Sequence, residues 1–179
     1  MGTLKVPVTQ RDHVKGPQNA PVTLLEYGDY ECPACGAAHP IVNMVLEHFG
    51  PTVRFAFRHF PITQVHPNAE AAAETAEFAG AHERFWAMHD AIYTNQEQLS
   101  VPLLLALTRA LRLSERELRD ALVSKRYANK VKSDFMTGVR SGVNGTPSFF
   151  INGRQHEGTY AYEDLVRAVE AYLPANAGL

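Results

Sequence analysis

The chain has 179 residues and a mass of 19.8 kDa, which suits one domain or one domain carrying an insertion. Hydrophobic residues make up 45% and charged residues 20%, so we expect a buried core and not a disordered chain. Seventeen Lys and Arg against 19 Asp and Glu leave no basic surplus for nucleic acid, and no apolar run is long enough for insertion into a membrane.

The N-terminal segment, residues 1–20, is polar and contains Pro7, Gly16 and Pro17. We therefore expect an extended, loosely held arm. The segment has neither the apolar region nor the cleavage site of a secretory signal. This favours a cytoplasmic protein, with a periplasmic or extracellular location as the alternative if a signal has been removed.

A strand, a helix and a second strand are predicted over residues 21–62. The run VTLLEY at 22–27 is apolar and bounded by Pro21 and Gly28, which is typical of a buried strand. Apolar residues then recur at three- and four-residue steps from Pro33 until Gly50-Pro51 ends the helix. VRFAF at 53–57 predicts the next strand. Such a unit has parallel strands and a right-handed crossover.

The segment 63–142 has a helical period throughout. An Ala/Glu stretch follows Asn68, and Ser114 with Glu117 forms a capping box. Because the strands before and after this segment need one another to form a sheet, we expect a helical insertion within one α/β domain.

The final segment, residues 143–174, completes the predicted sheet, and residues 175–179 form a tail. SFFI at 148–151 is a strand, and Asn152-Gly153 predicts a type I′ hairpin with Arg154–Glu157 as the return strand. A last helix is expected from Tyr160 to Tyr172.

The two cysteines of the chain, Cys32 and Cys35, lie where the first strand passes into the first helix. Pro33 favours the first helical turn, which puts Cys32 at the N-cap and Cys35 one turn inside. Residues three apart on a helix are neighbours, so the sulfurs can form a disulfide. The helix N-terminus lowers the pKa of a cysteine placed there. Cys32 is therefore the candidate nucleophile of disulfide exchange, and Cys35 the resolving thiol.

A zinc site is the alternative for these cysteines. Cys32, Cys35 and His39 have CxxCxxxH spacing, and His59 or His66 could complete four ligands. Structural zinc sites usually add a second cysteine pair, or two histidines three to five residues apart, and His59 and His66 have no such partner. We therefore expect no metal and no other cofactor.

Two further residues have chemistry that depends on their surroundings. Glu26 lies in the apolar strand; if it is buried, its pKa is raised and it can carry the proton of Cys35. A solvated edge position or an ion pair is the alternative. Pro147 must occupy the first position of its strand or an edge, and the local sequence alone favours a trans bond before it.

Taken together, the motifs VTLLEY, YECPAC and GTPSFFING, in this order over about residues 20–173, resemble the thioredoxin superfamily and its DsbA-like branch. The resemblance implies a thioredoxin fold, β-α-β then β-β-α, with an inserted helical domain. It implies that Cys32 and Cys35 are the catalytic pair, that Glu26 is the buried acid, and that the Thr146–Pro147 bond is cis. The expected substrate-binding residues are Thr146, Pro147, Pro33 and Ala34.

The expected function is thiol–disulfide exchange with protein or peptide substrates and with an unidentified redox partner. DsbA carries a histidine where this chain has Ala34, and the absence of that histidine predicts a less oxidising couple. The direction, as oxidase, isomerase or reductase, stays open. A zinc-binding module and a non-catalytic peptide-binding domain are the alternative functions.

Overall fold

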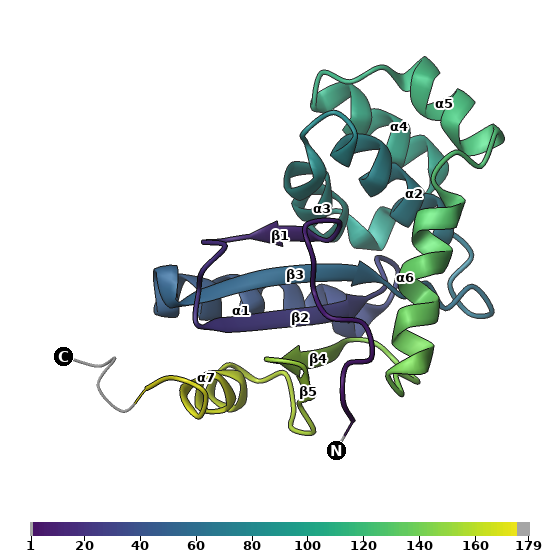
Figure 1. Ribbon diagram of the computed structural model, residues 1–179. Coiled ribbons are helices and arrows are strands. Elements are labelled where there is room, and N and C mark those ends of the chain that lie inside the picture. The colour runs from purple at the N-terminus through teal and green to yellow at the C-terminus, as the bar shows by residue number, and fades with distance from the viewer. Residues whose placement is uncertain (1, 175–179) are drawn as a thin grey trace.

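The fold is built around one five-stranded sheet with the strand order β1-β3-β2-β4-β5 (Figure 1). The computed structural model describes residues 2–174, and the predicted tail at 175–179 lies outside them. The strands are β1 (His13–Lys15), β2 (Val22–Gly28), β3 (Val53–His59), β4 (Ser148–Ile151) and β5 (Arg154–Gln155). The helices are α1 (Pro33–Phe49), α2 (Ala69–Gly80), α3 (Phe85–Thr94), α4 (Val101–Ala110), α5 (Glu115–Val123), α6 (Ala128–Arg140) and α7 (Tyr162–Glu170), with short 3-10 turns η1 (Gly50–Thr52) and η2 (Gln96–Gln98).

The centre of the fold is the predicted unit of β2, α1 and β3. β2 and β3 are parallel and pair along their whole length, which confirms that prediction. Both strands are almost entirely buried, since protein covers both faces of the sheet. Pro33 begins α1, and Gly50, whose φ is 52°, ends it. The carboxyl end of β2 therefore leads directly into the N-terminus of α1, where the cysteines lie.

Two hydrophobic clusters cover the opposite faces of the sheet. On one face, α1, α3 and α7 pack against a cluster that includes Leu24 and Phe149. On the other face, α6 and the N-terminal arm pack against Leu25 and Phe150. This alternation follows from the strand period of two residues. A buried side chain on β2 therefore faces either the cysteines on α1 or the arm and α6.

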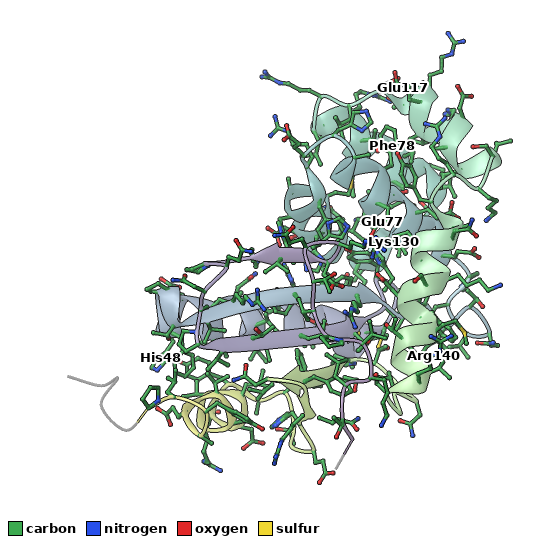
Figure 2. All side chains as sticks on the ribbon, viewed as in Figure 1. His48, Glu77, Phe78, Glu117, Lys130 and Arg140 are labelled. Atoms are coloured by element: carbon green, nitrogen blue, oxygen red, sulfur yellow. The ribbon has the colours of Figure 1, made fainter. Side chains whose placement is uncertain are left out.

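Of the helices between β3 and β4, α2, α3, α4 and α5 form the lobe seen above β1 in Figure 1, and α6 runs down beside the sheet. Phe78 of α2 and Leu118 of α5 belong to a separate apolar cluster within this lobe. The side chains of Glu77 and Lys130 lie where the lobe meets the sheet (Figure 2). There, Glu77 Oε1 accepts a hydrogen bond from His59 of β3 at 2.8 Å. The domain boundaries at residues 62 and 142 stay predictions.

The N-terminal arm is held firmly against the sheet, so the expectation of a loosely held arm was wrong. Its residues His13–Lys15 form β1, which is antiparallel to β3. Further out, Thr3 bridges Arg154 of β5. Backbone pairing at both edges of the sheet therefore stabilises a segment whose composition is that of a loop.

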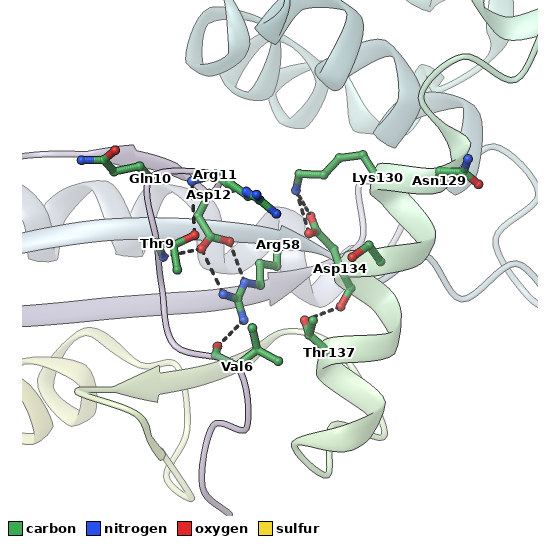
Figure 3. Close-up of a pocket in the computed structure, with 11 residues that line it drawn as sticks. Val6, Thr9, Gln10, Arg11, Asp12, Arg58, Asn129, Lys130, Asp134 and Thr137 are labelled. Atoms are coloured by element: carbon green, nitrogen blue, oxygen red, sulfur yellow. Dashed lines mark hydrogen bonds and ion pairs between the residues drawn. The ribbon is translucent and has the colours of Figure 1, made fainter.

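A buried arginine provides the second attachment of the arm. The guanidinium of Arg58 in β3 donates to both carboxylate oxygens of Asp12, at 2.7 and 3.0 Å, and to the carbonyl of Val6 at 2.8 Å (Figure 3). These residues line a cavity of about 870 Å³ between the arm, β3 and α6. The partners lie far apart in the sequence, and local composition carries no signal for such a pair.

The β4–β5 connection confirms the predicted hairpin. Asn152 and Gly153 have φ values of 46° and 81°, as a type I′ turn requires. The return strand is shorter than expected and ends at Gln155. The last helix spans Tyr162–Glu170, within the range expected for it.

Candidate active site

The two cysteines lie at the N-terminus of α1, as predicted. Cys32 is the N-cap residue, and Cys35 follows in the first helical turn. Both are free thiols. Cys32 is 7% exposed, whereas Cys35 is completely buried. Only the Cys32 sulfur can therefore meet a large substrate without rearrangement of the fold.

The pKa values of the two thiols are shifted in opposite directions. Hydrogen bonding from the Cys35 thiol and from the backbone N–H groups of Cys35 and Ala34 lowers the pKa of Cys32 to about 5, against the effect of burial. Burial raises the pKa of Cys35 well above its ordinary value, and its hydrogen bond to Cys32 and the charge of Glu26 add to this. At neutral pH the pair therefore carries a thiolate on Cys32 and a proton on Cys35.

The loop before β4 closes the site opposite Cys32. The Thr146–Pro147 peptide bond is cis, as the resemblance implies. Cys32 Sγ lies 3.4 Å from the Thr146 carbonyl oxygen. Pro147 stands immediately before β4, outside the ladder that its missing N–H would interrupt. The structure thus brings Thr146 to Cys32, with exposed Pro33 and half-buried Ala34 on the adjoining helical turn.

Glu26 is buried, and the sequence had left burial open against a solvated edge position or an ion pair. It is 2% exposed, and its sheet neighbours are Phe57 on β3 and Phe149 on β4. Its Oε1 has no hydrogen-bond partner. Burial, together with the charge of Cys32, raises the pKa of Glu26 to about 8, although Lys15 opposes this. The carboxyl group is therefore protonated at neutral pH and can exchange its proton near the cysteines.

No motif in the sequence points to Gln96, which lies in η2 and holds the active-site loop by hydrogen bonds. Its side-chain Nε2 donates to the carbonyl oxygens of Tyr30 at 2.9 Å and Cys32 at 2.7 Å. Its Oε1 lies against Gly36, where a Cβ atom would overlap it. Gly36 therefore allows the helical lobe to approach the active-site helix closely.

Tyr93 of α3 is a second residue that the sequence did not connect with the site. It packs in the same apolar cluster as Cys32 and Cys35, and its ring stacks on His39 with centroids 5.0 Å apart. Its hydroxyl is buried without a hydrogen-bond partner.

The histidines proposed for a zinc site are bonded elsewhere. His59 Nε2 bonds Glu77 at 2.8 Å, and His66 Nδ1 bonds Asp29 at 2.8 Å. Within residues 2–174, the groups of potential ligand atoms that lie close together contain no cysteine. The structure therefore does not assemble the Cys32, Cys35 and histidine ligand set.

A second group of potential ligands joins His59, Glu77 and Asp134. The Lys130 ammonium group lies 2.6 and 2.7 Å from the two carboxylate oxygens of Asp134, and 3.7 Å from Glu77. The chain's own lysine thus supplies the positive charge that these two carboxylates require.

A CxxC pair opening a helix, opposite a cis-proline and beside this sheet, defines a thioredoxin-like protein. The profile of the family described as Thioredoxin matches residues 8–171, and the chain belongs to this family.

Solved structures with DsbA-like folds agree with this assignment. BdbD from Bacillus subtilis superposes with a TM-score of 0.86 at 21% identity, covering 96% of this chain and 97% of that one. Alpha-DsbA1 from Wolbachia pipientis gives a TM-score of 0.82 at 19% identity, with 94% of each chain covered. A thioredoxin-like oxidoreductase from Silicibacter pomeroyi gives 0.78 at 24% identity, with coverage of 91% and 92%.

The similar curated proteins carry a different kind of name. A Na(+)/H(+) antiporter NhaA 1 from Salinispora arenicola is 46% identical over 167 residues, which are 93% of this chain and 26% of that protein. A Na(+)/H(+) antiporter NhaA 3 from Salinispora tropica is 45% identical with the same coverage. The chain thus spans about a quarter of the length of these relatives. Among the described residues, no helix is both long and apolar enough to cross a membrane.

Proposed function

We propose that this chain is a thiol–disulfide oxidoreductase that exchanges disulfides with protein or peptide substrates through Cys32 and Cys35. One observation carries the proposal. The Cys32 sulfur lies at a helix N-terminus, with hydrogen bonds that lower its pKa to about 5, while its partner thiol is buried one helical turn away. A stabilised thiolate beside a protonated thiol is the arrangement that disulfide exchange requires.

The exchange proceeds in two steps. In the reducing direction, the Cys32 thiolate attacks one sulfur of a substrate disulfide, and the other substrate sulfur leaves with the electron pair. Glu26 first releases its proton to solvent, and Cys35 then transfers its own proton to the ionised carboxylate and attacks Cys32. The Cys32–Cys35 bond forms as the bond to substrate breaks, so the substrate gains two electrons and the enzyme loses two. The oxidising direction is the reverse sequence.

The substrate-binding part of the proposal rests on Thr146. Its backbone lies beside the Cys32 sulfur, where an extended peptide can bind as an additional strand. Pro147, Pro33 and Ala34 provide the rest of the contact surface. Because Ala34 adds no donor of its own side chain to the Cys32 thiolate, we propose a couple less oxidising than that of DsbA.

The antiporter names of the relatives describe proteins about four times as long as the matching segment. We propose thiol chemistry for this chain because both cysteines, Glu26 and Pro147 lie inside that segment. The cytoplasmic location stays a prediction, and alkylation of thiols in living cells distinguishes it from a periplasmic or extracellular one. A reducing compartment keeps the pair as thiols, and an oxidising one keeps it as a disulfide.

A redox titration in glutathione buffers, read by thiol counting, tests the proposal. We expect a reversible two-electron couple whose potential gives the direction, near about −120 mV for an oxidant and about −270 mV for a reductant. Cys35→Ser should accumulate mixed disulfides with a peptide substrate, and Cys32→Ser should form none. Absence of a reversible couple, or thiols that become reactive only after a chelator is added, would favour a zinc module. Peptide affinity without any exchange would favour a binding domain.

A further inference from the structure

Tyr93 has a buried hydroxyl group with no hydrogen-bond partner, next to the cysteine pair. Buried polar atoms are nearly always paired, and an exception calls for a structural or chemical reason. The ring cannot easily turn away, because it is packed against Tyr30, with centroids 4.9 Å apart, and against His39. The hydroxyl is therefore held in an apolar site at a cost that its resting contacts do not offset.

The position of the hydroxyl follows from the geometry of β2. Glu26 and Gly28 are two residues apart, so they point to the same face, which α1 and α3 cover. A Cβ atom on Gly28 would lie 3.0 Å from Tyr93 Oη, so the hydroxyl lies against the end of the strand. The next residue, Asp29, donates its backbone N–H to Cys35 Sγ at 3.5 Å. The hydroxyl, the Glu26 carboxyl and the Cys35 thiol therefore share one buried region.

The charges in this region determine which hydrogen bond the Tyr93 hydroxyl can make. Burial, with the charges of Cys35 and Glu26 next, raises the pKa of Tyr93 well above its ordinary value, so it stays a hydrogen-bond donor. At rest, Cys35 and Glu26 are both protonated and present no anion to that donor. Resolution of a mixed disulfide needs one of these two protons to leave, and the buried negative charge then requires a donor.

We propose that the Tyr93 hydroxyl is a positioning donor that stabilises the single negative charge formed on the Cys35–Glu26 pair during resolution. The inference rests on the proposed function. One proton leaves to solvent, and the other resides on Glu26 when the Cys35 sulfur attacks. The Cys32–Cys35 bond forms, the bond from Cys32 to substrate breaks, and the substrate sulfur departs as a thiolate with the electron pair.

Tyr93→Phe removes the hydroxyl and keeps the ring, so the test is the pH dependence of resolution in this variant. A peptide disulfide that releases a different chromophoric thiol in each step lets stopped-flow mixing follow attack and resolution separately. The titratable or charged groups around the hydroxyl are the same in both proteins: Lys15 on β1, Glu26 on β2, Asp29 and Tyr30 on the following loop, Cys32, Cys35 and His39 on α1, His59 on β3, and His89 and Asp90 on α3. The difference between the two profiles therefore isolates the hydroxyl.

We expect resolution to be roughly 10- to 100-fold slower in Tyr93→Phe at pH 6–7, the range of a lost hydrogen bond to a charged group. The profile should move to higher pH by about one to two units and meet the wild-type profile once hydroxide removes the proton. Attack by Cys32, which needs no proton from this pair, should keep its rate.

Tyr27→Phe is the matched control. Its hydroxyl is also buried, but it lies on the opposite face of the sheet and bonds Thr137 and Arg58. This variant should lose stability and keep the wild-type resolution profile. Unchanged resolution in Tyr93→Phe, or equal slowing of both steps at every pH, overturns the inference. A wild-type protein that exchanges no disulfide overturns the proposed function itself.

Discussion

Replacing Glu26 by glutamine tests whether the buried carboxyl is neutral in the folded protein. Burial raises the pKa of Glu26 to about 8, compared with 4.5 for an ordinary glutamate. Between these pH values the folded chain retains a proton that the unfolded chain has released. The contribution of this group to stability is therefore complete below pH 4.5 and is lost as the pH rises through 8. Within that window the wild-type free energy of unfolding falls by about 1.4 kcal/mol per pH unit from this group alone.

The magnitude follows from the same two values. At pH 7, keeping the carboxyl neutral costs about 3 kcal/mol, and above pH 8 the total reaches about 5 kcal/mol. Glutamine has nearly the same shape and cannot ionise. We therefore expect Glu26→Gln to gain stability over the wild type by an amount that is smallest near pH 4.5 and grows steadily up to pH 8. A constant offset from altered packing would not change this slope.

Urea unfolding of the reduced proteins from pH 4 to 9 measures the effect. Trp86 is the single tryptophan of the chain and packs against the main core, so its fluorescence reports global unfolding. Glu163→Gln, at an exposed position on α7, removes the same charge at the surface and should follow the wild-type curve. Parallel curves for Glu26→Gln and the wild type would refute the reasoning, because Glu26 would then ionise alike in the folded and unfolded chains.

Two further variants test how the site and the arm are held. Gly36→Ala pushes Gln96 away from the two carbonyls it bonds, and we expect a net loss of about 1 kcal/mol in urea unfolding after the gain in helix propensity. Gly145→Ala, where a Cβ meets open space, should change stability by less than about 0.5 kcal/mol, and equal effects would contradict the bracing role. Arg58→Met removes the buried guanidinium that binds the arm and should cost about 3–5 kcal/mol and expose the arm to proteases. Arg116→Met, at an exposed position on α5, is its control, and similar losses in both would show that the arm does not depend on Arg58.

The parts of the fold that could be predicted are those with local signals. The apolar run of β2, Pro33 at the start of α1 and Asn152-Gly153 in the hairpin each favour one conformation over a few residues. The arm could not be predicted in this way. Part of its attachment comes from Arg58, which is bonded to residues about 50 positions away in the sequence. Only the three-dimensional structure brings those partners together.

The residues of the candidate site also separate into those with a local signal in the sequence and those that depend on tertiary packing. Cys32 and Cys35 are adjacent on one helical turn, so spacing alone brings them together. Glu26 was recognised as a residue whose environment would decide its role, but sequence could not choose between burial and exposure. Tyr93 and Gln96 come from α3 and η2, and their contacts with the cysteines depend on how the helical lobe packs against α1.

In the proposed exchange, the ionisation pattern of the site also determines the order of the two steps. The thiolate is on Cys32, the more exposed sulfur, so attack on substrate needs no prior proton transfer. The protons on Cys35 and Glu26 are retained by the same burial that prevents substrate from reaching them. Cys35 therefore becomes nucleophilic only when one of those protons leaves. In the proposed exchange, that delay gives the mixed disulfide its lifetime, and we expect the lifetime to depend on how well the buried region stabilises one negative charge. For this reason we regard the polar groups on the β2 face near Cys35 as the part of the protein that controls the rate of release.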